Sequence, residues 1–348
     1  MLPSRLALVQ APMAGVQDQR LTLAVARTGA VGSLPCAMLT PDAMRSQLQA
    51  LHTGCAAQHT YNVNFFCHTP QTATAEQLAR WQERLRPLAQ RWHTTPGTGN
   101  ATRQPFDAAT AELLEEFKPP IVSFHFGLPA PDLLRKVKAW GSFVLSSATT
   151  VEEALWLVQH GADGVIAQGL EAGGHRGHFL SDDLTLQMGT FALLPQVVAA
   201  LPSSVPVVAA GGINSPQAVQ AAYALGASAV QCGTAYLCAD EALTSSVHRA
   251  ALQSPAARHT QLTTAFSGRP ARGIVNAALR ELGAFPEAAP PFPHASAAWA
   301  PVRAAAEAQG SGDASPLWSG QNASTCRSAP AAEITDYLLS TANTSNTP

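Results

Sequence analysis

The stretch from Gln168 to His178 holds the most concentrated group of chemically useful residues in the sequence. Three glycines, Gly173, Gly174 and Gly177, surround His175 within it. A loop with three glycines loses much chain entropy on ordering, so a purely structural loop would gain little from them. An imidazole has an ordinary pKa of about 6.5 and exchanges protons near neutral pH. We therefore predict that His175 is catalytic and that the glycines let this loop pack against a flat ligand.

Other histidines leave alternatives open. A surface histidine without a role is the alternative interpretation of His175, and His178 is the second candidate for the catalytic residue. His125, at the end of an expected strand, is either a site residue or a core histidine with one hydrogen bond. These residues and His68 show no HxH or HExxH spacing and no evident carboxylate partner, so no metal site is predicted.

Two glycine turns follow neighbouring apolar runs late in the chain. They are Gly211-Gly212-Ile213-Asn214 and Gln231-Cys232-Gly233-Thr234. Each leads into a predicted helix, and backbone N–H groups at a helix N-terminus bind anions well. Glycine lets the backbone approach phosphate oxygens closely, and Thr234 adds a hydroxyl donor. The pair favours a phosphate site, although glycines can also serve only to make tight turns.

An alternation of short apolar runs and amphipathic stretches must position these residues. Strands are expected at Leu6–Gln10, Ala30–Leu34, Tyr61–Phe66, Ile121–Phe126, Phe143–Ser147, Gly164–Ala167, Val205–Ala210 and Ala229–Cys232. Helices are expected at Leu21–Arg27, Ala75–Arg91, Pro131–Ala139, Val151–Gln159, Phe191–Leu201 and Pro216–Leu225. Such alternation implies a parallel sheet, and eight strands favour a closed (β/α)8 TIM barrel. Gly161 and Gly226 are each expected to end a helix just before a strand.

The rest of the chain departs from this rhythm. Arg91–Phe106 reads as a surface loop, and the strand pattern stops at Asp240. Later helices are expected at Glu241–Leu252, Ile274–Leu282, Ala298–Ala308 and Ile334–Leu339, with an extended Pro-rich run at Phe285–Pro293. We predict a barrel domain over 1–239, a helical lid over 240–310, a segment returning to the barrel over 311–340 and a disordered tail over 341–348.

Composition excludes several classes of function. The chain has 21 Lys and Arg against 23 Asp and Glu, which argues against a nucleic-acid partner. No apolar window is long enough to span a membrane, and no signal peptide is evident. The 6 cysteines form no CxxC pair, which is typical of free thiols in a reducing compartment. We expect a cytoplasmic monomer or homodimer. The sequence lacks the glycine motifs of a dinucleotide-binding fold or a P-loop.

Several stretches together resemble the nitronate monooxygenases, formerly called 2-nitropropane dioxygenases. They are Ala11–Gly15, Asn62–Phe66, Ser123–Gly127, Gln168–Gly177, Ala209–Ile213, Gln231–Thr234, Phe266–Asn276 and Leu317–Gln321. The most specific element is the string EAGGHRG from Glu171 to Gly177, because it joins several motif positions to one histidine.

The resemblance implies an FMN-dependent enzyme that oxidises alkyl nitronates, such as propionate 3-nitronate, with O2 and without reduced nicotinamide, and so detoxifies nitro compounds. It implies flavin contacts from Asn64, Gln168, Gly173, Gly212, Gln231, Gly233 and Thr234. Further contacts to flavin or substrate are expected from Met13, His125, Gly174, Gly211 and Ser267. His175 then lies beside the substrate, as a base toward a neutral nitroalkane or as a hydrogen-bond donor to a nitronate.

The sequence departs from this family in its tyrosines. The stretches where relatives carry pocket tyrosines read Leu85-Arg-Pro-Leu88 and Phe292-Pro-His-Ala295, so we expect an altered pocket wall. Two other functions stay open. One is an FMN-dependent enoyl-thioester reductase that uses NAD(P)H, and the other is a non-catalytic sensor of a phosphorylated ligand.

Overall fold

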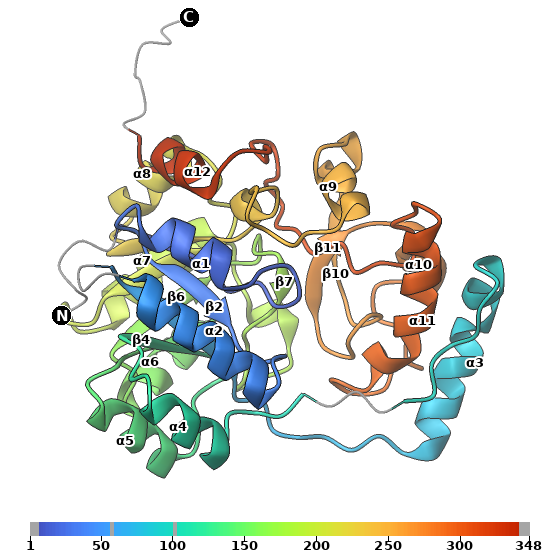
Figure 1. The fold of residues 1–348 in the computed structure, drawn as a ribbon, viewed down its shortest axis with the longest axis horizontal. Coiled ribbons are helices and arrows are strands. Elements are labelled where there is room, and N and C mark those ends of the chain that lie inside the picture. The colour runs from blue at the N-terminus through green and yellow to red at the C-terminus, as the bar shows by residue number, and fades with distance from the viewer. Residues whose placement is uncertain (1–6, 56–58, 100–102, 341–348) are drawn as a thin grey trace, which may run out of the picture.

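Eight parallel strands form the central sheet of the computed structural model, which describes residues 7–55, 59–99 and 103–340 (Figure 1). In spatial order they are β1 (Leu8–Gln10), β9 (Ala229–Cys232), β8 (Val207–Ala210), β6 (Gly164–Gln168), β5 (Phe143–Ala148), β4 (Ile121–His125), β3 (Tyr61–Phe66) and β2 (Gly32–Pro35). A parallel bridge between Val9 and Val31 joins the two ends of this order. The Gln10 amide donates to the Val31 carbonyl at 2.8 Å across the same seam. The sheet therefore closes, and the predicted TIM barrel is confirmed.

Helices cover the outside of the barrel. They are α1 (Gln19–Ala26), α2 (Pro41–Gly54), α4 (Ala108–Glu115), α5 (Pro131–Ala139), α6 (Val151–Gln159), α7 (Thr190–Ala200), α8 (Pro216–Ala224) and α12 (Ala331–Leu339). The expected barrel elements are present, most with ends shifted by one or two residues, while Leu6 lies outside the described residues. The sequence patterns had not singled out α2 and α4. Gly161 and Gly226 have φ of 102° and 96°, as expected where a glycine ends a helix before a strand.

The inside of the barrel is filled by one compact apolar cluster. Its members come from every strand of the barrel except β3, or from the edge of a strand: Val9, Val31, Ile121, Leu145, Ile166, Val208, Ala210 and Ala229. Alternate residues of the same strands point outward and pack beneath the helices. The barrel is thus a packed core, and a ligand can bind only at its rim.

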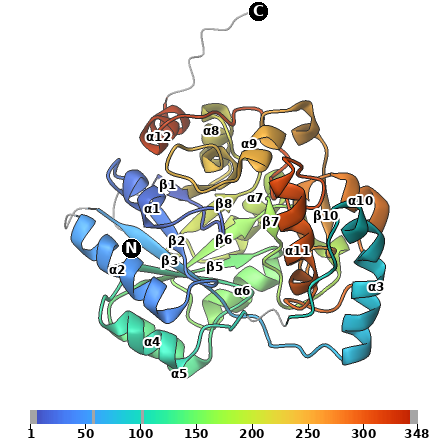
Figure 2. The ribbon, with the colours of Figure 1, turned by 45° about the vertical axis from the view of Figure 1, so that its right-hand side comes forward.

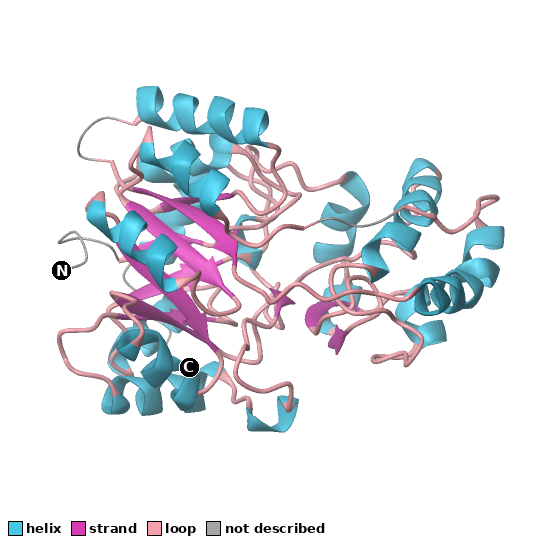
Figure 3. Ribbon diagram, turned by 90° about the horizontal axis from the view of Figure 1, so that it is seen from below, coloured by secondary structure: helices cyan, strands magenta, loops and turns pink. Residues whose placement is uncertain are grey.

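A second group of elements packs beside the barrel. It contains α3 (Ala75–Arg91), α10 (Ala277–Leu282) and α11 (Ala295–Ala308), and Figures 2 and 3 show it on the side away from α2 and α5. Trp81 of α3 and Trp299 of α11 lie in its apolar core. The Trp81 indole donates to the Ala295 carbonyl at 3.1 Å. Thus α3, which the sequence placed within the barrel unit 1–239, packs in the structure against α11.

The expectation that strands stop at Asp240 is wrong. β10 (Thr260–Thr263) pairs antiparallel with β11 (Ala271–Ile274), and β11 pairs antiparallel with β7 (Gly174–His175). The helix expected at Ile274–Leu282 begins only at Ala277, because Ile274 ends β11 and the Asn276 side chain caps the helix. These strands are only two to four residues long, too short for a local periodicity to mark them.

The last helix of the described chain lies against the barrel helices. α12 packs against α1 and α8. α9 (Ser246–Leu252) is shorter than the helix expected over Glu241–Leu252, and α11 starts three residues before the expected Ala298. The predicted tail at 341–348 lies outside the described residues, and the division into 1–239, 240–310 and 311–340 stays a prediction. No helix within the described part is long and apolar enough to cross a membrane.

Candidate active site

His175 lies in β7, at the rim of the barrel, and its backbone is fixed from two sides. Its carbonyl oxygen accepts a hydrogen bond from Gln168 Nε2 at 3.1 Å and lies 3.2 Å from His125 Nε2. The other end of the Gln168 amide accepts from the Gly177 N–H at 2.8 Å. Gln168 therefore holds the loop with both ends of its side chain and acts as a positioning residue for His175.

His125 lies at the rim of the barrel, next to His175. Its Nδ1 lies 3.0 Å from Ser147 Oγ. Burial lowers the pKa of His125 to about 3, so the ring is neutral at ordinary pH. A carbonyl oxygen can only accept, so Nε2 carries the proton and donates to the carbonyl of His175, while Nδ1 accepts from Ser147. Both ring nitrogens of His125 thus have hydrogen-bond partners, one of them in His175, and a contact of His125 with flavin or substrate stays a prediction.

The ring of His175 is anchored by a serine that is distant in the sequence. His175 Nε2 lies 2.9 Å from Ser267 Oγ, and Ser267 Oγ donates to the Arg269 carbonyl at 3.1 Å. Both bonds are satisfied when His175 Nε2–H donates to Ser267, which leaves Nδ1 with its lone pair. Burial lowers the pKa of His175 well below its usual value, and the positive charge of Arg103 lowers it further. His175 is therefore a neutral imidazole at pH 7.

Four aromatic rings surround His175. Its ring centroid lies 5.4 Å from that of Phe292, 5.8 Å from Trp318, 6.1 Å from Phe126 and 6.4 Å from Phe66. Phe126 has a φ of 71°, a left-handed backbone conformation that residues other than glycine rarely adopt. Phe292 lies in the second of the two stretches where the resemblance led us to expect a tyrosine, and this wall presents a phenyl ring with no hydroxyl.

The other such stretch does not reach His175. Leu85 and Leu88 are buried between α3 and α11, in the apolar core of the second group of elements. Of the two stretches, only the one before α11 reaches the wall beside His175, and the α3 stretch contributes packing.

The glycines of the loop have a different structural cause from the one expected. A Cβ on Gly173 would lie 2.5 Å from the Gly320 nitrogen, and one on Gly177 would lie 2.8 Å from His125 Cε1. Both glycines are thus required by close packing against the protein's own chain. Gly174 has a φ of 69°, and a Cβ at this position would meet no atom within 4 Å. Of the three, only Gly174 fits the expectation of a glycine that leaves room for a ligand.

The two glycine turns lie together, and the C-terminal segment crosses them. Gly211 and Gly212 have φ of 116° and 72°, so these turns require glycine. The Gly320 N–H donates to Thr234 Oγ1 at 2.9 Å, and Asn322 Nδ2 donates to the Gly212 carbonyl at 3.2 Å. Residues 318–322 therefore join the ends of β8 and β9 into one site, which local sequence could not show.

The barrel mouth also offers polar groups to a ring-shaped ligand. Gln231 Oε1 is buried and finds no hydrogen-bond partner among the described residues. A buried acceptor without a donor is costly, which points to a ligand that donates to it. Around Gly233, a Cβ would meet only Ala11 Cβ at 3.4 Å and Met13 Sδ at 3.9 Å. At the end of β3, Asn64 Nδ2 donates to Ser123 Oγ at 2.9 Å. These residues fit a ligand with a polar ring system and a phosphate.

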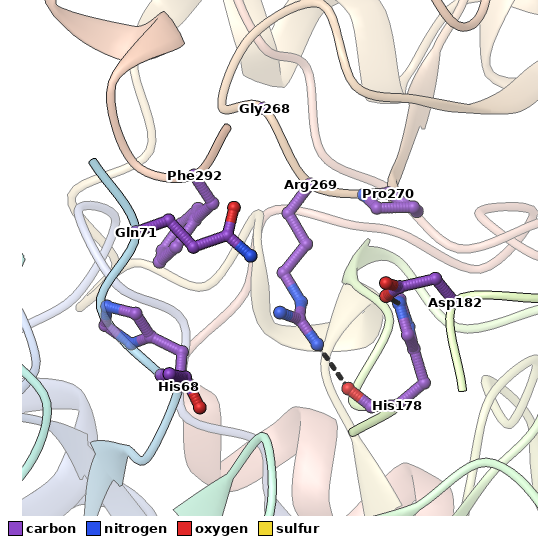
Figure 4. A pocket seen from close by; sticks show the side chains of 9 residues that line it. His68, Gln71, His178, Asp182, Gly268, Arg269, Pro270 and Phe292 are labelled. Carbon is purple, nitrogen blue, oxygen red and sulfur yellow. Dashed lines mark hydrogen bonds and ion pairs between the residues drawn. The ribbon is translucent and has the colours of Figure 1, made fainter. Parts of the chain in front are cut away.

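A cavity of about 200 Å³ adjoins the site. His68, His178, Asp182, Arg269 and Phe292 line it, and Figure 4 shows Arg269 extending between His68 and His178. Burial lowers the pKa of His178 to about 4, and its Nε2 lies 3.5 Å from Asp182 Oδ1. His178, the second candidate, thus faces this cavity.

Sequence reasoning missed two arginines near His175. Arg269 lies in the stretch Phe266–Asn276 that carried the family resemblance, which was the available signal. Arg103 lies in the stretch read as a surface loop, where nothing marked it. In the parts of the chain described by the structure, no three His, Cys, Asp or Glu residues gather as they would around a metal ion.

A closed barrel thus carries paired glycine turns after β8 and β9 and a fixed histidine at its rim, an arrangement suited to an enzyme that binds a phosphorylated ligand. A family model described as nitronate monooxygenase matches residues 2–340. The chain therefore belongs to the nitronate monooxygenase family, and its reaction class is the oxidation of nitronates.

Relatives of known name support this assignment. The nitronate monooxygenase of Paraburkholderia phytofirmans is 39% identical over 336 residues, covering 95% of this chain and 90% of the relative. That of Pseudomonas aeruginosa is 38% identical, covering 95% of each. Among solved structures, a nitroalkane oxidase from Streptomyces ansochromogenes matches with a TM-score of 0.87 and 37% identity, covering 96% and 94%. FabK from Thermotoga maritima, with a TM-score of 0.68 and 23% identity, covers 96% and 91% and shares the fold.

Proposed function

We propose that the protein binds FMN and oxidises alkyl nitronates with O2, and that it thereby detoxifies nitro compounds. The observation that carries this proposal is the neutral His175 held at the barrel rim beside the two glycine turns, in a chain of the nitronate monooxygenase family. FMN, when bound, supplies the electron acceptor for the nitronate and the donor for O2. Propionate 3-nitronate is the proposed substrate.

The residues present support FMN in particular. The turns at Gly212 and at Gly233-Thr234 would hold its phosphate, because backbone N–H groups at such turns bind anions. Gln231 Oε1, buried without a partner in the described structure, would accept a hydrogen bond from the flavin ring. Asn64 and Gly173 are further proposed contacts.

His175 is proposed to act as a base toward a neutral nitroalkane. Its Nε2–H is engaged by Ser267, which leaves the Nδ1 lone pair to accept the proton from the carbon that bears the nitro group. Donation of a hydrogen bond to an anionic nitronate would require the ring to give up its contact with Ser267. The same contact, together with the carbonyl bonds of His175, prevents the ring from turning away.

The visible spectrum of the purified protein tests the cofactor. We expect the absorption bands of oxidised flavin without added cofactor, and FMN on release by denaturation. A colourless protein that binds no FMN on titration would contradict the proposal.

The reductase remains the second candidate, and reduced nicotinamide distinguishes the two. FabK shares only the fold at this level of identity. On anaerobic mixing we expect NADH and NADPH to leave the flavin oxidised and a nitronate to bleach it. Rapid bleaching by NADH would instead support the enoyl-thioester reductase. In a sensor without catalytic activity, neither NADH nor a nitronate would bleach the flavin.

Two properties of the whole protein are proposed with less structural detail. All six cysteines are free thiols, which supports a reducing, cytoplasmic compartment. A monomer or homodimer stays a prediction from the sequence.

A further inference from the structure

Two arginines lie over the aromatic wall of the site. Arg269 Cζ lies 4.1 Å from the ring centroid of Phe126, and Arg103 Cζ lies 5.6 Å from that of Phe292. Phe126 and Phe292 are themselves 5.8 Å apart, and both contact His175. The two guanidinium groups therefore lie over adjacent rings of the same wall.

Neither arginine has a carboxylate partner among the described residues. Every ion pair found there involves other arginines, lysines or a histidine. Arg269 Nη2 donates to the His178 carbonyl, but its Nε is buried without a partner. Asp182, which lines the same cavity, is fully exposed and lies beside His178. Its attraction for Arg269 is therefore weakened by water.

Partly buried guanidinium groups without counter-ions are unfavourable unless an anion joins them. The electrostatic effect of both arginines reaches His175, since both lower its pKa. The cavity of about 200 Å³ beside Arg269 has room for a small polar group. A positive field that extends from His175 to this cavity suits a substrate with two negative charges a few bonds apart.

We propose that Arg103 and Arg269 form a second anion subsite, which binds a carboxylate of the substrate while the nitronate lies beside His175. This inference rests on the proposed function and adds to it the residues that select the substrate. The preferred substrates are then nitronates that carry a carboxylate, and simple alkyl nitronates are poorer substrates. A guanidinium suits this role because its N–H groups match the two oxygens of a carboxylate.

A pair of substrates of equal size tests the subsite. The nitronates of 3-nitropropionate and 3-nitropropanamide differ by one negative charge. We expect the holoenzyme to oxidise the carboxylate with a kcat/KM about tenfold or more above that of the amide, as charge-assisted hydrogen bonds imply. Arg103→Met is expected to remove most of this preference, chiefly by raising KM for the carboxylate-bearing nitronate more than for the amide.

Matched variants separate charge from folding. Arg103→Lys keeps the charge and is expected to retain part of the preference. Arg86→Met, which removes an exposed arginine paired with Glu83 on α3, is the control and should leave kcat/KM for both nitronates unchanged. For Arg269 the variant of choice is Arg269→Lys, which keeps a cation near the cavity. Arg269→Met is avoided because it would also remove the hydrogen bond to the His178 carbonyl that supports the loop.

Binding of inert mimics makes the test independent of turnover. Succinate resembles the dianionic substrate, and succinamate lacks its second charge. Calorimetry is expected to show tighter binding of succinate to the holoenzyme, and a loss of about tenfold in Arg103→Met.

The outcomes separate this inference from the proposed function. One outcome is that the wild-type enzyme and Arg103→Met both oxidise the two nitronates with the same ratio of kcat/KM values. That result would overturn the subsite and leave the proposed function standing. If neither nitronate is oxidised, the proposed function fails, and succinate binding then decides. Loss of succinate binding in Arg103→Met would support the subsite, and unchanged binding would overturn it.

Discussion

His125 Nε2 lies 3.2 Å from the backbone carbonyl oxygen of His175, and burial keeps the His125 ring neutral with the proton on that nitrogen. One histidine therefore sets the position of another without sharing a proton with its ring. Because Ser147 holds the far side of the His125 ring at 3.0 Å, the support extends from β5 through β4 to β7. Activity should depend on this chain of contacts as well as on His175.

Substitution of His125 tests the positioning role. We expect His125→Leu to lower kcat about tenfold or more while FMN affinity changes little, because the lost hydrogen bond releases the β7 backbone. His125→Gln keeps a side-chain N–H and is expected to recover part of kcat. Steady-state kinetics and flavin titration measure the two effects. Equal kcat in wild type and His125→Leu would contradict the role.

Replacement of His175 separates base chemistry from nitronate binding. We expect His175→Ala to oxidise neutral nitroalkanes about 100-fold or more slowly, which is the usual loss for a missing general base. Oxidation of nitronates formed in advance should be largely retained, since they need no proton removed. Oxygen consumption with both substrate forms measures the difference. If every nitroalkane and nitronate were turned over as in wild type, His175 would have no catalytic role.

Gln231 offers a test of flavin binding that spares the protein's own contacts. Its Oε1 accepts no hydrogen bond in the described structure, so Gln231→Leu removes no internal bond of that atom. We expect the FMN Kd to rise about tenfold, in line with a hydrogen bond worth about 1.4 kcal/mol. Thermal unfolding of the flavin-free protein should change little. A weaker FMN affinity accompanied by a collapse in Tm would indicate a structural role instead.

Buried histidines should make stability depend on pH. Burial lowers the pKa values of His68, His178 and His248 from 6.5 to about 4. On acidification the unfolded chain takes up these protons first, so the stabilisation is complete above pH 6.5 and is lost as the pH falls toward 4. At pH 5 each histidine should cost about 2 kcal/mol of the free energy of unfolding.

Urea unfolding at pH 7.5 and pH 5.0 measures this loss. His248→Gln can still donate to the Trp318 carbonyl, which His248 Nε2 approaches at 3.0 Å, but it cannot titrate. The variant should therefore lose less stability between the two pH values than wild type does. Equal unfolding free energies of wild type at both values would contradict the prediction.

The barrel and the family could both be predicted from the sequence, which also marked the paired glycine turns and His175 as a candidate site. Each of these depends on short-range patterns: the apolar run of a strand such as Tyr61–Phe66, the glycines at Gly211-Gly212, or the string around His175. Such patterns reflect constraints within a few residues, and those constraints are readable along the chain.

The contacts that hold His175 and the side chains that surround it depend on the folded chain. Ser267 reaches it across 92 positions of sequence, and β11 turns the histidine loop into a strand of a small sheet. Gly173 is required by the backbone of Gly320, and Arg103 comes to the site from a segment that reads as a loop. These contacts join segments whose spacing along the chain carries no periodic signal, so they become visible only when the chain is folded.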